Sequence, residues 1–258
     1  MRRLILIAAV GATALLGAAV ARGELKVEDG LRLGFDARFS PHTLPRDRDV
    51  PVSVDISGTV RTTDGSQPPQ LRRMTVAVNR YGRMSTRGLP RCRAGRLEST
   101  SSEVALARCR RALVGRGRFG AKVEFPNVAP FPVKGRMLAF NGRLGGRQVI
   151  YLHIHGSNPI EATVVLTFRV KRLGKGRFGT VLTTRIPRIA SDLGYVTDVA
   201  LTFGRRYRFA GESRSFISAR CAAPVGFPGA IFTFAKGSFF FAGGKSIRTA
   251  VVRDCLVR

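Results

Sequence analysis

The stretch from Leu89 to Gly120, LPRCRAGRLESTSSEVALARCRRALVGRGRFG, carries the clearest helix pattern in a chain otherwise patterned for strands. Thr100-Ser-Ser-Glu103 has the form of a capping box, in which a hydroxyl and a carboxylate each satisfy a first-turn backbone N–H. Apolar side chains then recur at helical spacing as far as Leu113, and Gly115 is a typical residue to end a helix. We therefore expect a helix over residues 101–113, with Cys109 on its apolar face.

The end of this stretch, Gly115-Arg-Gly-Arg-Phe-Gly120, matches the G-x-G-x-x-G pattern of dinucleotide-binding proteins. In those proteins a strand precedes the glycines and a helix follows, so that the phosphates meet a helix N-terminus. Here the helix comes first, and its C-terminus is the wrong end of the dipole for a phosphate. We reject a nucleotide site and expect a turn. In the similar Gly174-Lys-Gly-Arg-Phe-Gly179, the first three residues are expected to form a turn that leads into a strand from Phe178.

The first residues predict export. Arg2 and Arg3 precede a charge-free, mostly apolar run, and Ala19-Val20-Ala21 has the form of a signal-peptidase site. We expect a signal peptide over residues 1–21 and a secreted, extracytoplasmic mature chain of one domain over residues 22–258. An uncleaved anchor is the alternative. No later apolar run is long enough to cross a bilayer as a helix, so no transmembrane segment is expected after cleavage.

Four cysteines in an exported chain indicate two disulfides. Three pairings are possible, and we expect neighbours in the sequence to pair, as Cys92–Cys109 and Cys221–Cys255. The chain-entropy relation gives the first staple about 3 kcal/mol. There is no C-x-x-C pattern of the kind that holds structural zinc.

The rest of the chain reads as short strands separated by turns rich in proline and glycine. The clearest one, residues 160–171, alternates apolar with polar side chains. A phenylalanine-rich stretch, with two strands expected at residues 230–235 and 238–242, must lie inside a sheet, since an exposed edge of this composition would aggregate. We expect an all-β, antiparallel, jelly-roll-like sandwich. Its other strands are expected at residues 31–39, 50–56, 71–79, 121–125, 131–140, 148–155, 178–186, 196–203, 207–209, 215–219 and 247–254.

The formal net charge is +28, and removal of Arg2 and Arg3 with the signal lowers it to +26. This charge favours anionic partners, although arginines spread along the whole chain are also what a compositional bias produces. Arg205-Arg206-Tyr207-Arg208 interleaves cations with an aromatic ring and is the candidate contact for an anionic ligand. A solvated hairpin end is the alternative for this segment. In an exported protein an anionic cell-wall polymer or acidic glycan is favoured over nucleic acid.

No group of residues has the pattern of a catalytic, cofactor or metal site. His153 and His155 lie two apart on a strand with Tyr151, so a metal there would need a third ligand, such as His42. Asp47 and Asp49 are poor calcium ligands because arginines surround them. Glu124 and Glu161 are the strand-borne candidates for the two carboxylates of a glycosidase, but sequence does not pair them. There is no nucleophile elbow of the G-x-S-x-G type.

Several motifs resemble a pattern in a family of exported, disulfide-bonded actinobacterial proteins of unknown function. The resemblance covers most of the mature chain and implies an exported β-protein with no assigned activity and no catalytic residues. Its motifs are Leu89-Pro90-x-Cys92, Ala105-Leu106-x-x-Cys109, Leu113-Val114-Gly115-x-Gly117, Phe39-Ser-Pro41-x-x-Leu44-Pro45, Ala139-Phe140-Asn141-Gly142 and the cysteine-bounded C-terminal unit.

We therefore expect a non-enzymatic binding or structural protein at the cell surface. The alternative is a carbohydrate-active or other hydrolase on a jelly-roll scaffold, which rests on fold analogy alone. A concave face that holds paired carboxylates, or His153 and His155 beside an acid, would favour the hydrolase.

Overall fold

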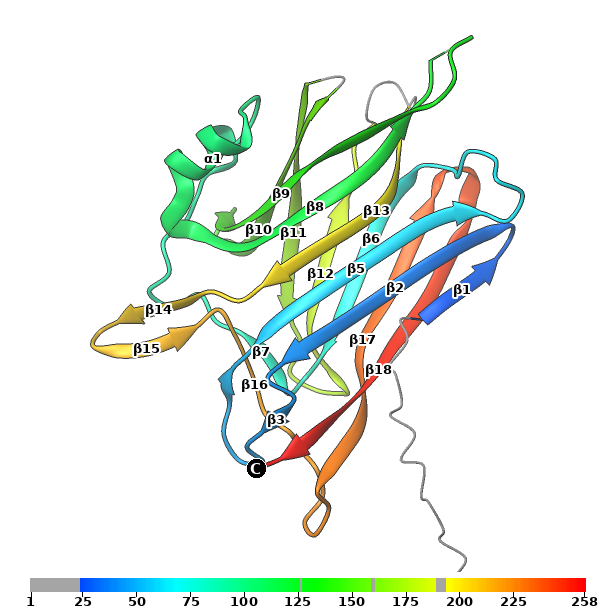
Figure 1. Cartoon of the computed structure of the whole chain (residues 1–258). Coiled ribbons are helices and arrows are strands. Elements are labelled where there is room, and N and C mark those ends of the chain that lie inside the picture. Colours follow the sequence, from blue (N-terminus) through cyan, green and yellow to red (C-terminus); the bar gives the residue numbers. More distant parts are fainter. Residues whose placement is uncertain (1–23, 126, 159–160, 189–193) are drawn as a thin grey trace, which may run out of the picture.

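A computed structural model describes residues 24–125, 127–158, 161–188 and 194–258. The expected signal peptide over residues 1–21 lies outside the described residues. Figure 1 shows strands almost throughout and one short helix at the side of a large curled sheet. The all-β class is therefore confirmed.

Within the described residues, thirteen strands form the large sheet, in the order β1-β2-β5-β13-β8-β9-β10-β11-β12-β6-β17-β18-β3. Neighbouring strands run antiparallel, except that β3 pairs in parallel with β18. The bounds are β1 Glu24–Glu28, β2 Leu31–Ser40, β3 Thr43–Leu44, β5 Ser53–Thr62, β6 Leu71–Asn79, β8 Leu113–Val123, β9 Phe131–Leu144, β10 Arg147–Asn158, β11 Ala162–Arg172, β12 Phe178–Arg185, β13 Gly194–Phe203, β17 Gly229–Phe241 and β18 Ser246–Val257.

The two ends of this sheet pack on each other, which is why it curls. The alternating side chains of β2 are buried from Leu31 to Phe39, as the sequence pattern predicts. They contact apolar side chains of β17 and β18, from the other end of the strand order. The ring centroids of Phe35 and Phe239 are 5.6 Å apart, and those of Phe39 and Phe234 are 5.5 Å apart. The expected sandwich of two separate sheets is not confirmed, because one sheet supplies both layers of this core.

The phenylalanine-rich stretch is a single strand, β17, where two were expected. It lies between β6 and β18, with a register irregularity between Thr233 and Ala235. Its place inside the sheet is confirmed.

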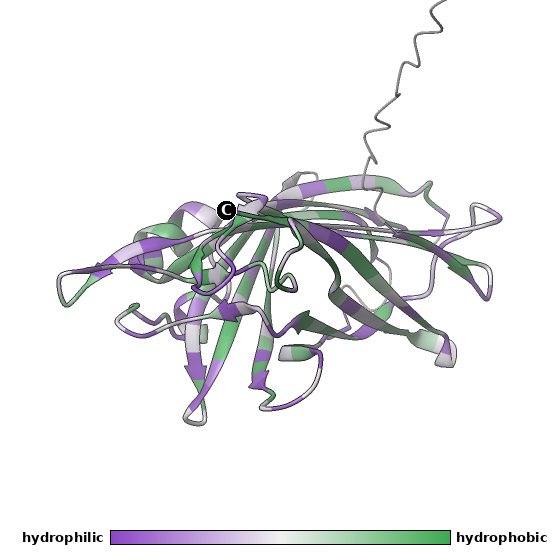
Figure 2. Ribbon diagram, turned by 90° about the horizontal axis from the view of Figure 1, so that it is seen from below, coloured by the Kyte–Doolittle hydropathy of each residue, from purple (hydrophilic) through white to green (hydrophobic). Residues whose placement is uncertain are grey.

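Two small sheets complete the strands. The first contains β4 (Val50–Pro51), β16 (Ile217–Ala219) and β7 (Gly82–Met84). The second is a hairpin of β14 (Arg206–Phe209) and β15 (Glu212–Ser215). Figure 2, viewed from the end where the C terminus lies, shows the strands of the large sheet fanning outward from that end.

The helical segment is shorter than the sequence pattern predicts. Helix α1 spans Ser102–Cys109 and continues as a 3-10 turn, η2, over Arg110–Ala112. Its N-cap is Ser101, whose Oγ accepts a hydrogen bond from the Val104 N–H at 3.3 Å, rather than Thr100. The Thr100 hydroxyl instead donates to the Leu97 carbonyl at 2.8 Å. A short 3-10 turn, η1 (Ala94–Arg96), precedes the helix.

Both expected disulfides, Cys92–Cys109 and Cys221–Cys255, are present. Cys92–Cys109 ties the approach to α1 against the end of that helix, and Cys92 also forms an isolated bridge with Gly142 of β9. We call residues 89–112 the helical module. From Cys92 to Ala112, its buried apolar side chains pack on Phe140, Val149 and Tyr151, on the outer face of β9 and β10.

The turn expected at Gly115–Gly120 is wrong, because these residues lie inside the long strand β8. β8 is paired on both sides, with β9 and with β13. A side chain at Gly117 would collide with the carbonyl oxygen of Ala200 on β13. The glycines here permit close approach of strands rather than a change of direction. By contrast, the turn at Gly174–Gly176 is confirmed, and Gly176 has a φ of +89°.

Candidate ligand-binding cavity and arginine pocket

The concave side of the curled sheet encloses an apolar cavity of about 300 Å³. Side chains of one parity on each strand point into it, because alternate residues of a strand face opposite sides. Strands from both halves of the sheet contribute, as do β7 and β16 at one end. Representative lining residues are Phe35 and Phe39 of β2, Ile56 of β5, Val76 of β6, Leu152 of β10, Phe168 of β11, Leu182 of β12, Leu201 of β13 and Phe232 of β17.

The protein does not fill this space with its own side chains. Val76, Phe168 and Leu182 face the interior, yet each is only half-buried. Protein interiors are normally packed as densely as organic crystals, and an unfilled apolar cavity reduces stability. An apolar cavity of this size lies within the range of small-molecule sites. The concave face therefore has the character of a binding site.

The cavity is elongated along the strands. Leu71 and Asn79, at opposite ends of β6, both line it. Eight residue steps of about 3.3 Å place these two positions roughly 26 Å apart. A volume of about 300 Å³ spread along such a length is narrow. This shape suits one extended chain better than a compact, rigid ring system.

Different structures border the two ends of the cavity. At one end lies the small sheet of β4, β16 and β7, where Arg172 of β11 donates a hydrogen bond to the Met84 carbonyl at 2.8 Å. At the other end lie the loop before β6 and the start of β13, which the Gln70 side chain joins by donating to the Gly194 carbonyl.

Charged groups are few along the cavity lining. Among the described residues that line it, the charged side chains are those of Asp198 and Arg220. Asp198 Oδ2 accepts a hydrogen bond from the Thr197 hydroxyl at 2.8 Å. Arg220 lies over the Tyr81 ring, 5.3 Å from its centroid, and 3.6 Å from a carboxylate oxygen of Asp49. The largely apolar lining would bind hydrocarbon rather than a charged group.

A second hollow, of about 260 Å³, brings together three arginines. We call it the arginine pocket; its lining is Gly88, Leu89, Pro90, Arg111, Arg205, Tyr207 and Arg208. Three of the four residues predicted as an anionic-ligand contact therefore meet here, and Arg206 does not line the pocket. Sequence reasoning missed Arg111, which follows Cys109 in η2, because its proximity depends on how the helical module docks.

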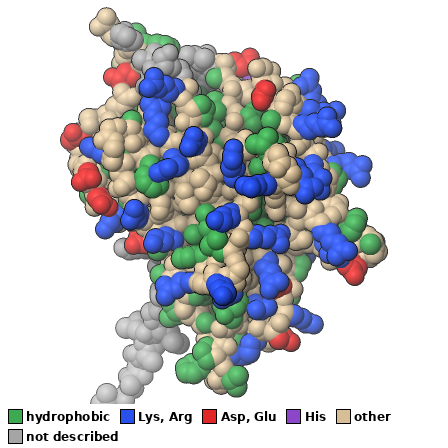
Figure 3. Space-filling view, turned by 180° about the vertical axis from the view of Figure 1, so that it is seen from behind, with side chains coloured by type: hydrophobic (Ala, Val, Ile, Leu, Met, Phe, Trp, Pro, Cys, Tyr) green, Lys and Arg blue, Asp and Glu red, His purple; other side chains and the backbone are tan. Residues whose placement is uncertain are grey.

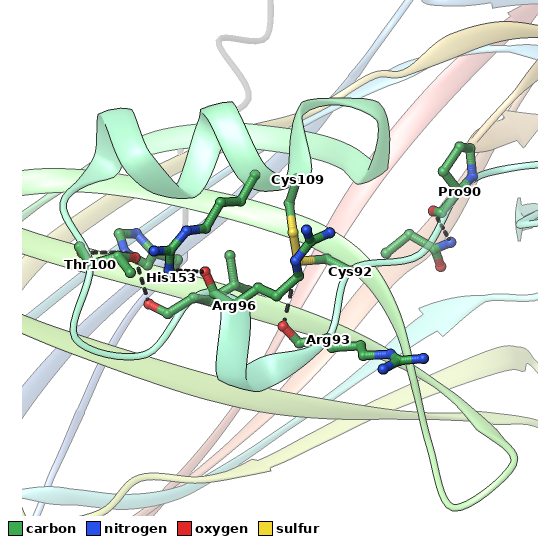
Figure 4. The surroundings of a disulfide bond; sticks show 10 residues. Pro90, Cys92, Arg93, Arg96, Thr100, Cys109 and His153 are labelled. Carbon is green, nitrogen blue, oxygen red and sulfur yellow. Dashed lines mark hydrogen bonds between the residues drawn. A yellow bond between two sulfur atoms is a disulfide. The ribbon is translucent and has the colours of Figure 1, made fainter.

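The walls of the arginine pocket are held by hydrogen bonds. The Tyr207 hydroxyl donates to the Arg87 carbonyl at 2.8 Å. The Asn141 side-chain amide donates to the Pro90 carbonyl at 2.8 Å, a contact that Figure 4 shows beside the disulfide. Arg205 Nε is buried and has no hydrogen-bond partner among the described residues. The lining contains no carboxylate. An oxyanion would supply the missing acceptor and the missing negative charge.

The two strand histidines lie on the outer face of β10, under the helical module and away from the cavity. His153 is fully buried, and its Nε2 lies 2.9 Å from the Thr100 carbonyl (Figure 4). His155 Nδ1 lies 3.0 Å from the Thr163 hydroxyl, and its Nε2 lies 3.8 Å from Glu161. Burial lowers the pKa of His153, so this side chain is neutral at physiological pH.

His42 does not join the other histidines; its Nε2 lies 3.0 Å from Asp254 Oδ2 at the C-terminal end. Within the described ranges, no group of three or more histidine, cysteine or acidic side chains is placed to hold a metal ion.

The candidate carboxylates are separate from the cavity. Asp47 is exposed, and Asp49 forms ion pairs with Arg83 and Arg220. Glu124 follows the end of β8, and Glu161 precedes β11, so neither lies on a strand as expected. None of these four carboxylates lines the cavity, although Arg220, which pairs with Asp49, does.

Comparisons of the chain with family models, with curated proteins and with solved structures find no match. Across the described part of the chain, no helix has both the length and the apolar character needed to cross a membrane.

Proposed function

We propose that this protein is an exported, non-enzymatic binding protein that holds one extended apolar chain, such as the acyl or prenyl chain of a lipid, in its cavity. The single observation that carries the proposal is the elongated apolar cavity that the curled sheet encloses and leaves unfilled. The hydrophobic effect is the driving force, because the ligand and the half-buried lining would both be removed from water.

Export is supported by the signal-peptide pattern and by the two disulfides, which persist in oxidising compartments. The resemblance to exported actinobacterial proteins of unknown function is part of the same proposal. At a cell surface, a chain-binding protein would keep a lipid or its precursor out of water while it moves or is stored.

The hydrolase alternative has less support. Glycoside hydrolysis needs two carboxylates facing each other across the substrate. Among the described residues that line the cavity, Asp198 is the carboxylate present. His155 does lie beside an acid, Glu161, but on the outer face of the sheet.

A second candidate function, contact with an anionic cell-wall polymer or acidic glycan, is favoured by the arginine pocket. Arg111, Arg205 and Arg208 converge there around a buried, unpartnered Nε, with Tyr207 offering a ring for stacking. Binding at this site would be largely electrostatic and would weaken as salt rises.

The cavity is tested by binding and by extraction. The mature protein is expressed with its disulfides, its organic extract is analysed by mass spectrometry, and the delipidated protein is titrated with a fluorescent fatty-acid probe. We expect a co-purifying lipid or saturable probe binding. The variants Val76→Phe and Leu182→Phe, which fill the cavity without burying charge, should weaken binding at least about tenfold.

The matched control is Val104→Phe, which enlarges an exposed apolar side chain on α1, outside the cavity. If both cavity variants bind the probe as tightly as the control, the ligand is not in the cavity. Absence of both an extracted lipid and probe binding would also refute the proposal.

The arginine pocket is tested by retention on cell-wall, polyanion and neutral-glycan matrices over a salt series. The double variant Arg111→Gln/Arg208→Gln should elute from polyanions at lower salt than Arg206→Gln/Arg111→Gln. The two variants remove the same charge, but Arg206 does not line the pocket. Equal elution of the two would mean that only net charge matters, and retention indifferent to salt would exclude an electrostatic contact.

A further inference from the structure

An exposed apolar tip lies at the end of the molecule where the C terminus is found. The loop between β16 and β17 reads Pro224-Val-Gly-Phe-Pro228, and the side chains of Val225 and Phe227 are 91% and 61% exposed. In Figure 1 this loop protrudes below the small sheet. Figure 3 shows hydrophobic side chains at this lower extremity, with basic side chains above them.

The exposed apolar surface continues from the loop onto the neighbouring hairpin. The register of β17 and β18 pairs Gly229 with Leu256, and Thr233 with Val252, on either side of Ile231. Alternate residues of paired strands share one face, so the three apolar side chains lie on the outer face around Asp254, which is the direct partner of Ile231. Their exposures are high at 80% for Ile231, 51% for Val252 and 46% for Leu256. We call Val225, Phe227, Ile231, Val252 and Leu256 the apolar tip.

Several backbone carbonyls of the loop have hydrogen-bond partners within the protein, so they do not need water. The Arg46 guanidinium donates hydrogen bonds to the carbonyls of Ala223 and Pro224, and to that of Phe227 at 2.9 Å. The Pro228 carbonyl accepts from the Val257 N–H at 2.8 Å, and prolines have no N–H to satisfy. Unsatisfied backbone groups are costly in hydrocarbon, and these contacts remove much of that cost.

The loop is also held in place. The Cys221–Cys255 disulfide joins its base to β18, and the Phe227 N–H donates to the Pro224 carbonyl at 3.2 Å. An ordered loop presents its two apolar side chains without losing further conformational freedom when it binds. Such construction is unnecessary for a loop that only connects two strands.

The charges near the tip favour an anionic surface. Arg46 donates hydrogen bonds to the tip loop, Arg48 lies two residues further along the loop after β3, and Arg258 follows the last residue of β18. The whole chain carries +28. Two carboxylates belong to the same region: Asp47 stands between the two loop arginines in the sequence, and Asp254 pairs with His42. A narrow convex protrusion of this kind suits the soft boundary of a bilayer better than the flat surface of a protein partner.

We propose that the apolar tip docks this protein on anionic lipid bilayers, with Val225 and Phe227 inserted among the acyl chains and the arginines at the headgroups. The proposal is independent of the cavity, although a protein that carries lipid chains would need such contact with a membrane. Each inserted side chain adds hydrophobic free energy, and the arginines add electrostatic attraction that salt screens.

Vesicle sedimentation tests the docking. The mature protein is mixed with phosphatidylcholine vesicles that either contain or lack phosphatidylglycerol. We expect binding to the anionic vesicles that weakens with salt, and a partition coefficient roughly tenfold or more lower for Val225→Ser/Phe227→Ser. The matched control, Val128→Ser/Leu144→Ser, removes two exposed apolar side chains elsewhere and should bind as the wild type does.

Insertion has a direct optical readout, because the chain contains no tryptophan. The variant Phe227→Trp should show a blue shift of its fluorescence on anionic vesicles and quenching by brominated acyl chains. The cavity-filling variant Val76→Phe should still dock, which separates this test from the proposed function. No vesicle binding, wild-type binding by Val225→Ser/Phe227→Ser, or bound Phe227→Trp without a shift would each overturn the proposal. The proposal would also be overturned if the wild-type protein did not bind vesicles but self-associated, and Val225→Ser/Phe227→Ser abolished that self-association.

Discussion

The two faces of the central strands are built in opposite ways. On the outer face, the helical module covers β9 and β10, and Phe140, Leu97 and Ala105 are each fully buried. On the inner face, Phe168 and Leu182 point into the cavity and remain half-buried. The same alternating strands supply both faces. The packed outer face contributes stability, whereas the inner face of the same strands borders a cavity that is available for a ligand.

Removal of a large side chain should show the largest difference in stability between the two faces. Phe140→Ala should lower the free energy of unfolding by about 3–5 kcal/mol, because it leaves a cavity in a packed core. Phe168→Ala should cost clearly less, since that ring already borders open space. Urea denaturation of the two variants measures the difference. Equal losses would show that the inner face is as tightly packed as the outer one.

Loss of the Cys92–Cys109 disulfide should affect the outer face alone. The double variant Cys92→Ala/Cys109→Ala should lose about 3 kcal/mol, as expected for a loop of this length. Binding of the fatty-acid probe should persist under conditions where the variant is folded, because the module does not line the cavity. If the folded variant, which keeps the Cys221–Cys255 disulfide, no longer binds the probe, the helical module supports the cavity.

Enlargement of a side chain should have opposite signs on the two faces. Leu182→Phe adds apolar contact inside the cavity and should raise stability by about 0.5–2 kcal/mol. Ala105→Leu adds volume where none is free and should lower stability by about 1–3 kcal/mol. Melting temperatures of the two variants provide the comparison. A destabilised Leu182→Phe would mean that the cavity collapses around its own side chains.

The smallest expected effect is a pH dependence carried by the outer face. Burial lowers the pKa of His153 in the folded state, with Glu103 and His155 as the neighbouring titratable groups. Below an unfolded-state pKa of about 6.5 the unfolded chain binds a proton that the folded chain does not. Stability should therefore fall as pH falls through this window, by at most about 1.4 kcal/mol per pH unit.

The variant His153→Gln isolates this contribution, since it keeps a donor for the Thr100 carbonyl but does not titrate. Denaturation curves at pH 7.5 and 5.5 should differ less for the variant than for the wild type. An unchanged difference would assign the pH dependence to other groups.

The local sequence pattern was sufficient to predict elements whose residues alternate or recur between a buried and an exposed face. The alternation of β2 and the helix near Cys109 follow from spacing along the chain. The expectation that neighbouring cysteines pair was one of three possible pairings, and the structure confirms it. Three of the four residues predicted for anion binding also meet in one pocket. Arg111 was not predicted as part of this pocket, because the local sequence does not indicate which hairpin the helical module will contact.

Two nearly identical hexapeptides show the limit of local reasoning. Gly174-Lys-Gly-Arg-Phe-Gly179 begins as a turn, with open space around Gly174 and Gly176, and its last two residues start β12. Gly115-Arg-Gly-Arg-Phe-Gly120 is strand, because β9 and β13 pair with it on both sides. Glycine permits either outcome, and the partner strands decide between them.

The sequence by itself determined that this chain is all-β, disulfide-bonded, strongly basic and provided with one short helix, because these properties depend on spacing and composition. Only the tertiary structure decided that thirteen strands form one sheet that curls until its ends meet. The cavity results from that closure, whereas the arginine pocket forms where the helical module adjoins β14, and the apolar tip where a loop joins the β17–β18 hairpin. They depend on contacts between residues far apart in the chain, which no local pattern encodes.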